Sequence, residues 1–355
     1  MKILIINPGS TSTKFAVYQA GNIQLEKTLR HSEIELAKYH SIAEQYEFRY
    51  QLIKSCLIDN THVINTFKGI IGRGGLLKPI KGGVYVINEQ MLQDLKSCAF
   101  GEHASNLGAI LAFAFSLEAG CPAFIADPVV VDEMDELARI SGVEGIKRKS
   151  IFHALNQKAA ARKTALQLNK PYESINLIVA HLGGGISVGA HQRGQVIDVN
   201  NALDGDGPFS PERSGSLPIG NIVNMCFSGE YSENEIRLKL KGKGGLVSYL
   251  NTNDAYEVQK KVEAGDSLAT LIYQAMAYQV SKSIGEQATV LKGQVDAIVL
   301  TGGIAHDQKH FIPWIKERTS FIAPIVVFPG EDELQALHDI CVQALKGELK
   351  IKQYR

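Results

Sequence analysis

The sequence has few cysteines, no excess of charge of either sign and no long apolar run. The five cysteines form no C-x-x-C pair, so we expect reduced thiols. Lys plus Arg and Asp plus Glu number 37 each, which argues against a broad nucleic-acid-binding surface. No stretch approaches the roughly 20 apolar residues of a membrane helix, and the first apolar run is too short for a signal peptide. We therefore predict a cytoplasmic protein that binds neither nucleic acid nor membrane.

Two common nucleotide-binding loops are also missing. No G-x-x-x-x-G-K-[ST] sequence occurs, which excludes a P-loop. Gly183 and Gly185 are followed by Val188, where the G-x-G-x-x-G dinucleotide fingerprint requires its last glycine. The residues after them are typical of a strand, whereas the fingerprint requires a helix. A nucleotide site in this chain must use another kind of loop.

What the sequence does contain is an internal repeat. Residues 2–24 and 175–199 each hold three short apolar segments typical of strands, with a glycine-rich turn after the first. A glycine closes the next hairpin in both copies, Gly21 in one and Gly194 in the other. A chain of 355 residues exceeds the usual size of a single core. Two copies of one unit in such a chain predict two similarly folded halves.

Helical and extended patterns alternate after each strand triplet. We expect helices at 34–58, 105–120, 267–292, 308–318 and 332–347, and strands near 84–87, 122–127, 295–300 and 324–328. This order predicts an α/β fold with two domains and mixed sheets. We place the domains at 1–150 and 151–334, and expect the helix at about 335–355 to pack back on the first domain.

Two turns at matching positions are suited to phosphate. The first, NPGSTSTK, contains Asn7, Ser10, Ser12 and Lys14, and the second, HLGGGIS, spans residues 181–187. Glycine lets the backbone approach a ligand closely, and N–H groups, hydroxyls and a lysine can face phosphate oxygens. Either turn alone is compatible with an ordinary hairpin. Their equivalent positions in the two halves favour a phosphate site.

A third glycine pair, Gly302 and Gly303, follows the strand expected at 295–300 and precedes a helix. A helix N-terminus behind two glycines can receive an anion or a nucleotide. A tight strand-to-helix turn without a ligand is the alternative.

These three turns, in this order, resemble the phosphate-1, phosphate-2 and adenosine motifs of the actin/hexokinase/Hsp70 superfamily. Within it, the sequence closely resembles the acetate/butyrate kinase family: N-x-G-S-[ST]-[ST]-x-K matches 7–14, and H-x-G-x-G-x-[ST]-[LIVM]-x-A-x-x-x-G matches 181–194. Butyrate kinases have about this length, whereas acetate kinases are longer. The resemblance implies two duplicated βββαβαβα-type (ribonuclease H-like) domains with the active site in the cleft between them. It also implies ATP or ADP as co-substrate, Mg²⁺ as cofactor, and a homodimer or a higher homo-oligomer.

The resemblance assigns roles to single residues. Arg73 in GRGG matches the family arginine that holds the substrate carboxylate, and Arg213 in PERSG matches the second arginine. His153 in IFHAL matches the histidine that hydrogen-bonds the transferring phosphoryl group, and Asp127 matches the aspartate near the nucleophile and the metal. The ATP-binding residues expected from the motifs are Asn7, Ser10, Ser12, Lys14, His181, Gly183, Gly184, Gly185, Gly302 and Gly303. The expected metal-binding residues are Asn7, Asp332 and Glu333, with the choice between the two acids open.

The chain also departs from the family pattern. Acetate kinases have a second histidine in F-H-G-T-S-H where this chain has Gln157, and an asparagine in H-L-G-N-G where it has Gly184. The family valine two residues after the carboxylate-binding arginine is Gly75. We expect this glycine to leave room for a longer acyl chain, in a pocket that Phe152 and Pro208 also line.

Each candidate has a purely structural alternative. The two arginines are of a type common in surface ion pairs, and His153 has the surroundings of a buried core histidine. Asp127 is placed to cap the turn after its strand. The acids at 331–333 suit the first turn of the helix that follows them, where they complement its dipole.

The chemistry needs few specialised groups. A carboxylic acid is already an anion at neutral pH, so no general base is required. The obstacle is repulsion between a carboxylate and a polyphosphate, which arginines, a histidine and Mg²⁺ can offset. We predict transfer of the γ-phosphoryl group of ATP to butyrate, which gives the acyl phosphate and ADP. Isobutyrate, isovalerate, propionate and acetate are alternative acceptors; a sugar or glycerol kinase and an actin-like nucleotide switch are less well supported.

Overall fold

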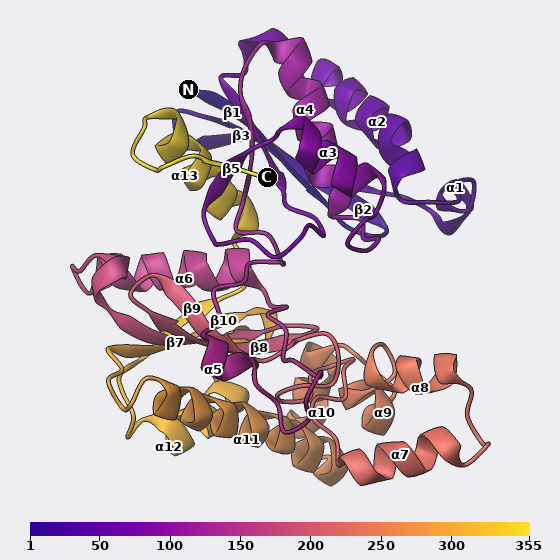
Figure 1. Cartoon of the computed structure of the whole chain (residues 1–355), viewed down its shortest axis with the longest axis vertical. Coiled ribbons are helices and arrows are strands. Elements are labelled where there is room, and N and C mark those ends of the chain that lie inside the picture. Colours follow the sequence, from indigo (N-terminus) through magenta and orange to yellow (C-terminus); the bar gives the residue numbers. More distant parts are fainter. The chain divides into compact units, whose positions relative to one another are not determined.

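The computed structural model describes all 355 residues, which form two compact units (Figure 1). Unit 1 contains residues 1–131 and 332–355, and unit 2 contains residues 132–331. Each unit is built on one mixed β-sheet with helices on both faces. The chain is therefore an α/β protein with two sheets.

The sheet of unit 1 has seven strands in the order β12-β5-β6-β4-β1-β2-β3. The bounds are β1 Lys2–Pro8, β2 Ser12–Gln19, β3 Asn22–Arg30, β4 Gly69–Arg73, β5 Val84–Val86, β6 Ala123–Ala126 and β12 Lys352–Gln353. Strands β1, β2 and β3 form an antiparallel meander, and β4 and β6 run parallel to β1 and to each other. The apolar run at 3–6 is fully buried, as a central strand covered on both faces requires.

Helices cover both faces of this sheet (Figure 1). Their bounds are α1 Glu33–Leu36, α2 Tyr46–Asp59, α3 Glu89–Lys96, α4 Asn106–Ala119 and α13 Glu333–Leu345. Leu4 and Ile6 belong to the core shared with α2, α3 and α4. Tyr18 points to the opposite face, where its ring stacks on His338 of α13 with a centroid distance of 4.4 Å. Alternation along the strands thus places α13 on one face and α2 to α4 on the other.

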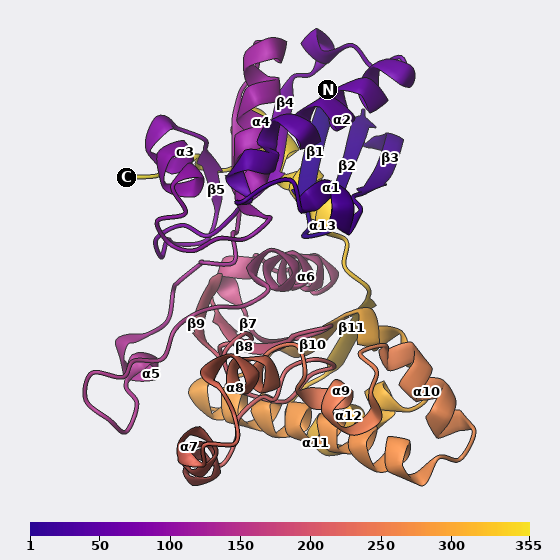
Figure 2. The same cartoon turned by 90° about the vertical axis from the view of Figure 1, so that its right-hand side faces the viewer.

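The sheet of unit 2 has five strands in the order β11-β10-β7-β8-β9. Their bounds are β7 Asn176–Leu182, β8 Ile186–Gln192, β9 Gln195–Val199, β10 Ala297–Gly302 and β11 Ile325–Pro329. The helices are α5 Glu136–Arg139, α6 Ala154–Gln167, α7 Ile219–Phe227, α8 Glu233–Leu240, α9 Gly245–Leu250, α10 Ala255–Glu263, α11 Ser267–Val290 and α12 Phe311–Thr319. Figure 2 shows α6 on one side of the sheet and α11 and α12 on the other, each over its own apolar cluster.

The two sheets share one topology. In β6-β4-β1-β2-β3 and in β11-β10-β7-β8-β9, the same neighbours pair in the same parallel or antiparallel sense. Both second strands carry a register irregularity, at Val17/Tyr18 and at Ala190/His191. Both following hairpins turn through a glycine with positive φ, 86° at Gly21 and 85° at Gly194. The predicted duplication is therefore confirmed.

The helices and strands expected from the sequence are present, with three kinds of difference. The helix expected over 34–58 is interrupted, because α1 ends at Leu36 and α2 begins only at Tyr46. Helices α3, α5, α6, α7, α8, α9 and α10 and strands β4 and β12 were not predicted. After Gly302 the chain forms a short 3₁₀ turn, Gly303–His306, and α12 begins only at Phe311. The glycine pair therefore lies at the start of a 3₁₀ turn and not at the N-terminus of an α-helix.

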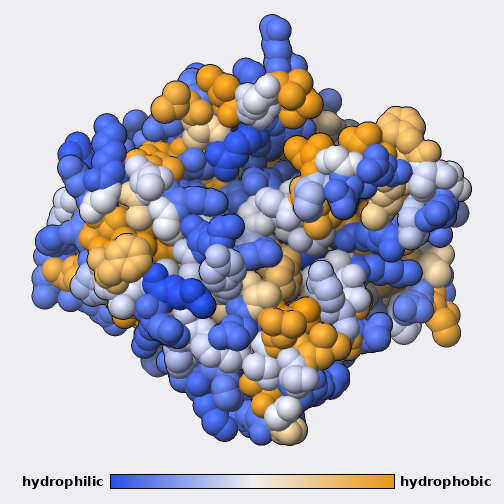
Figure 3. Space-filling model, turned by 90° about the horizontal axis from the view of Figure 1, so that it is seen from below, coloured by the Kyte–Doolittle hydropathy of each residue, from blue (hydrophilic) through white to orange (hydrophobic).

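The surface carries apolar side chains in separate places. Figure 3 shows one face on which apolar patches alternate with hydrophilic residues. Helix α7 has no buried residue, and its Ile219 and Phe227 are 78% and 86% exposed. No helix of the chain is long and apolar enough to span a bilayer. The homodimer expected from the sequence stays a prediction.

Candidate active site

In unit 1 the predicted site residues lie where neighbouring parallel strands end. Arg73 is the last residue of β4 and Asp127 follows the last residue of β6, while Asn7 is near the end of β1. The register pairs Ile6 with Gly72 and Arg73 with Ala126. The carboxyl ends of adjacent parallel strands form one edge, which is where open α/β sheets bind ligands.

Three residues of unit 1, Arg73, Asn7 and Glu333, form one hydrogen-bonded group. Arg73 Nη1 lies 3.1 Å from Glu333 Oε2, and Asn7 Nδ2 donates to the same carboxylate oxygen at 2.7 Å. Arg73 Nη1 also lies 3.4 Å from Asn7 Oδ1. Arg73 is about one-third exposed and uses only Nη1 in these contacts. Its remaining donors stay available to a second anion.

Asp127 has a structural role in addition to its place at this edge. Its Oδ1 accepts from the Gly83 N–H at 2.6 Å, and its own N–H donates to the Gly83 carbonyl at 3.1 Å. The side chain is buried, and the backbone has φ of 38°, which is rare for a non-glycine residue. Asp127 therefore holds the segment before β5 against the end of β6.

The turn between β1 and β2 presents polar groups that the protein leaves unused. The hydroxyls of Ser10, Thr11 and Ser12 make no hydrogen bond to the protein, and neither do the N–H groups of Ser10 and Thr11. Ser10 and Thr11 are exposed. Lys14 is paired with Glu26 at 2.9 Å, an exposed ion pair of the kind that contributes little and exchanges easily. The turn therefore offers donors to an anion.

In unit 2 two histidines stack behind the matching turn. The rings of His153 and His181 are parallel within 13°, with centroids 3.8 Å apart. His181 Nδ1 lies 2.8 Å from Asn156 Oδ1, and its Nε2 lies 3.1 Å from Glu331 Oε1. His153 Nδ1 lies 2.9 Å from Ser187 Oγ. Both rings are thus held in fixed orientations beside the turn between β7 and β8.

Because the glycines of this turn have no side chains, neighbouring side chains can lie close to the backbone. A Cβ on Gly185 would overlap the Arg213 guanidinium, and a Cβ on Gly183 would lie 2.8 Å from His181 Nε2. The Gly184 carbonyl accepts from Ser210 Oγ at 2.6 Å. At two of the three glycines, a side chain would displace a neighbouring side chain from its present position.

Arg213 is a partly buried cation of unit 2. Its Nη1 donates to the Ala202 carbonyl, while its Nε is buried without a partner. Burial lowers the pKa of its guanidinium below the ordinary value. A buried, unused N–H donor on a cation beside a glycine turn is suited to an anionic ligand.

The remaining predicted residues are placed as follows. A Cβ on Gly302, where φ is 94°, would overlap the Leu182 carbonyl, so this glycine is needed for packing. Gly303 has open space around it. Phe152 is buried at 2% exposure, and Pro208 lines a small hollow that Arg213 also lines.

The expectation for Gly75 is wrong. A Cβ at this position would lie 2.5 Å from the Cα and from the Oδ1 of Asn106, at the start of α4. Glycine is therefore needed for the close approach of the chain to α4, and it leaves no space that a valine would fill.

Sequence reasoning missed a buried polar chain behind the second turn. Gln157 donates to Ser187 Oγ at 2.8 Å, its Oε1 lies 2.9 Å from His191 Nε2, and His191 Nδ1 lies 2.7 Å from the Tyr172 hydroxyl. Burial holds the pKa of His191 well below its usual range, so this ring is neutral. Gln157 replaces a family histidine, and that departure was the available signal.

Magnesium fits the donor set of unit 1. Mg²⁺ takes oxygen ligands and usually keeps several waters, with one or two carboxylates and the substrate phosphates. The Asn7 amide and the Glu333 carboxylate lie together, with the amide nitrogen facing Glu333 and the amide oxygen facing Arg73. Asp332 is the exposed N-cap residue of α13. No group of three or more His, Cys, Asp or Glu residues is placed to hold a metal, so the phosphates would have to supply the other ligands.

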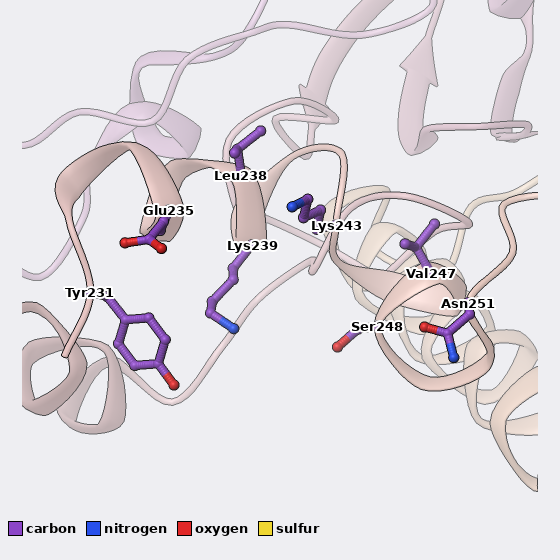
Figure 4. A pocket seen from close by; sticks show the side chains of 8 residues that line it. All are labelled: Tyr231, Glu235, Leu238, Lys239, Lys243, Val247, Ser248 and Asn251. Carbon is purple, nitrogen blue, oxygen red and sulfur yellow. The ribbon is translucent and has the colours of Figure 1, made fainter.

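A larger hollow lies away from all these residues. It has a volume of about 510 Å³ and lies between α8 and α9 (Figure 4). Lys239, one of its lining residues, is 4.9 Å from the ring centroid of Tyr231. None of the predicted site residues lines it.

Comparison with known proteins agrees with the fold. The solved structure of an acetate kinase from Porphyromonas gingivalis matches with a TM-score of 0.80 and 18% identity, covering 97% of this chain and 99% of that one. A propionate kinase from Francisella tularensis subsp. tularensis SCHU S4 matches at 0.73 and 21%, covering 95% and 98%. An acetate kinase from Entamoeba histolytica matches at 0.71 and 18%, covering 96% and 98%. The sequence model of the acetokinase family matches residues 140–317, which is half of the chain. The chain therefore belongs to the acetokinase family of carboxylate kinases.

Proposed function

We propose that the chain transfers the γ-phosphoryl group of ATP to a short-chain fatty acid, with butyrate as the preferred acceptor. The reaction is butanoate + ATP = butanoyl phosphate + ADP. A carboxylate oxygen forms the new bond to the γ-phosphorus as the bond from that phosphorus to the ADP oxygen breaks. No proton has to move, because the acceptor is already ionised at neutral pH.

The observation that carries this proposal is the carboxylate already bound to Arg73. The Glu333 side chain shows that a carboxylate fits against this guanidinium at 3.1 Å, beside the turn with unused hydroxyls. Arginine suits such a ligand because its planar fork can bind two oxygens at once. An acid substrate would use the Arg73 nitrogens that Glu333 leaves unused.

An alcohol acceptor is less well supported by the same geometry. Phosphorylation of a hydroxyl needs a base to take its proton. The carboxylates at this edge are engaged: Glu333 accepts from Arg73 and Asn7, and Asp127 accepts from Gly83. A sugar or glycerol kinase would need one of them as a base, whereas a carboxylate kinase does not.

Charge stabilisation would come from residues of both units. Arg213 and the His153–His181 pair supply donors in unit 2, and the turn at 9–12 supplies donors in unit 1. Donors of this kind stabilise a transferring phosphoryl group, where negative charge is greatest during transfer. Mg²⁺, held through Asn7 and Glu333 together with the phosphates, would offset part of that charge.

Butyrate as the acceptor rests on the resemblance in chain length, because Gly75 does not open an acyl pocket. Isobutyrate, isovalerate, propionate and acetate are the alternative acceptors. The proposed co-substrates are ATP and ADP.

The deciding experiment is a panel of acids with MgATP and hydroxylamine, which traps acyl phosphates as hydroxamates. We expect hydroxamate with short-chain acids and the highest kcat/KM with butyrate. A higher value with another acid would correct the substrate only. ADP release with glycerol or glucose, and hydroxamate with none of the acids, would overturn the proposal.

A further inference from the structure

Arg49 is a fully buried cation in unit 1 that the proposed mechanism does not use. It lies on α2, one and two turns before Ile53 and Leu57, and all three side chains are 0% exposed. Arg49 forms no ion pair with any carboxylate. A buried charge without a counter-ion is costly, and such a group is a candidate for a functional role.

The guanidinium of Arg49 binds the carbonyl groups of the turn between β1 and β2. Its Nη1 donates to the carbonyls of Gly9 at 2.8 Å and Ser12 at 3.0 Å, and lies 3.1 Å from Thr13 Oγ1. Its Nη2 donates to the Ser10 carbonyl at 3.0 Å. Gln45 Oε1 accepts from Nε and Nη2, at 3.2 and 2.7 Å. All three nitrogens of the guanidinium are therefore engaged.

Every carbonyl of the turn points to a protein donor as a result. Arg49 binds the carbonyls of Gly9, Ser10 and Ser12, and the His31 N–H donates to the Thr11 carbonyl at 2.9 Å. Carbonyl oxygens would repel a phosphate, so their withdrawal matters for anion binding. The opposite groups, the hydroxyls and the two unused N–H groups, are those that the protein leaves without a partner.

The charge of this group is settled by its surroundings. Burial lowers the pKa of Arg49 to about 10, so the guanidinium stays cationic at neutral pH. Burial and the charge of Arg49 lower the pKa of His31 to about 4, so His31 is neutral. One positive charge therefore lies beneath the turn, and no protein anion neutralises it.

We propose that Arg49 is a positioning residue of the phosphate site: it fixes the turn with its carbonyls inward and supplies a buried positive charge for the phosphates of the nucleotide. This inference rests on the proposed function. A purely structural role is the competing reading, in which Arg49 only fills the space under the turn. The two differ in what a variant does to nucleotide binding when the fold is intact.

The test compares three variants. Arg49→Met keeps the length of the side chain without its charge and donors, and Arg49→Lys keeps the charge without the fork. Ile53→Ala, on the same buried face of α2, destabilises the packing and leaves the guanidinium in place. For each protein the thermal midpoint, the Kd for MgATP by calorimetry without any acid, and the KM values for ATP and butyrate are measured.

We expect Arg49→Met to weaken MgATP binding by about thirtyfold, as the loss of charge-assisted hydrogen bonds predicts, with the butyrate KM nearly unchanged. Arg49→Lys should lie between this variant and the wild type. Ile53→Ala should lower the thermal midpoint and leave the Kd nearly unchanged. If Arg49→Met does not fold, Arg49→Lys decides by its MgATP affinity alone.

Wild-type affinity for MgATP in a folded Arg49 variant, an equal loss in Ile53→Ala, or a wild-type protein that binds no MgATP would overturn the inference. The proposed function fails separately. If no acid is phosphorylated but MgATP binding still depends on Arg49, the substrate proposal falls and the positioning role stands.

Discussion

The β1–β2 turn and the β7–β8 turn occupy equivalent places in two sheets of the same topology. Different contacts hold them in place. In unit 1 the β1–β2 turn is held from below by Arg49, and its own hydroxyls are left unused. In unit 2 the β7–β8 turn has no hydroxyl, and residues from outside the repeat, Arg213 and Ser210, come to its glycines.

The difference shows where each half obtains its donors. The first turn carries them on its own residues 10–12, so it needs a conformation that turns its carbonyls away from the ligand. The second turn is bare backbone, so it needs glycines that let neighbouring side chains approach. A duplicated scaffold thus keeps its topology while the chemistry of the two turns diverges.

The two arginines should separate binding from transfer. Arg213→Ala should lower kcat by on the order of a hundredfold, about 3 kcal/mol, because it removes a buried donor for the transferring group. Arg73→Ala should chiefly raise the KM for the acid. Steady-state kinetics with both substrates varied measures the split, and Arg237→Ala, an exposed arginine of α8 paired with Glu233, is the matched control. Unchanged kinetics in either folded variant would remove that arginine from the site.

The bare turn should tolerate a methyl group at one glycine and not at its neighbour. Gly185→Ala places a Cβ on the Arg213 guanidinium, whereas the nearest atom to a Cβ on Gly184 is 3.9 Å away. We expect Gly185→Ala to lower kcat on the order of tenfold or more, because it displaces a group that must be positioned closely. Gly184→Ala should lose clearly less. Equal losses would show that access to the backbone, and not the approach of Arg213, limits this turn.

The two acids at the start of α13 should differ in metal dependence. Glu333→Gln removes the carboxylate beside Asn7 and should raise the Mg²⁺ concentration for half-maximal activity by about tenfold. Asp332→Asn, one residue earlier and exposed, is the control and should shift it less. A titration with Mg²⁺ at fixed ATP measures both. The reverse order would assign the metal to Asp332.

The buried histidines should give both units the same pH dependence. The pKa of His31 is lowered to about 4, and the pKa of His191 lies well below 6.5. Below about pH 6.5 the unfolded chain binds protons that the folded chain does not. The contribution of these neutral histidines to the free energy of unfolding is therefore fully present above pH 6.5 and decreases as the pH falls toward 4. The difference between the urea midpoints at pH 7.5 and pH 5 should be smaller in His31→Gln and in His191→Gln than in the wild type. His40→Gln, at an exposed histidine, is the control and should keep the wild-type difference. An unchanged difference would show that these rings do not govern the acid response.

The repeat and the two turns were predictable because their signals are local. A glycine hairpin, an apolar strand and a polar turn are each read within a few residues, and both copies agree. Gly75 was misjudged because its neighbour is Asn106, which is far away in the sequence. Arg49 left a weaker signal: it shares the i, i+4, i+8 face of α2 with Ile53 and Leu57, so an arginine stood in an otherwise apolar stripe. The contact of Glu331 with His181 has no sequence signal, because it depends on tertiary packing.

Unit 1 is built from both ends of the chain, so it can be completed only after the last residues have been synthesised. Residues 332–355 supply α13 and β12, β12 pairs with β5, and Tyr354 is 2% exposed within the unit 1 core. All residues of unit 2 lie between the two segments of unit 1. Unit 2 can therefore fold during synthesis while the first segment of unit 1 still lacks the helix that covers one face of its sheet. The Arg73–Glu333 contact is then among the last to form. A translation product released before residue 332 would hold a complete second unit and a first unit with its apolar sheet face open to chaperones and proteases.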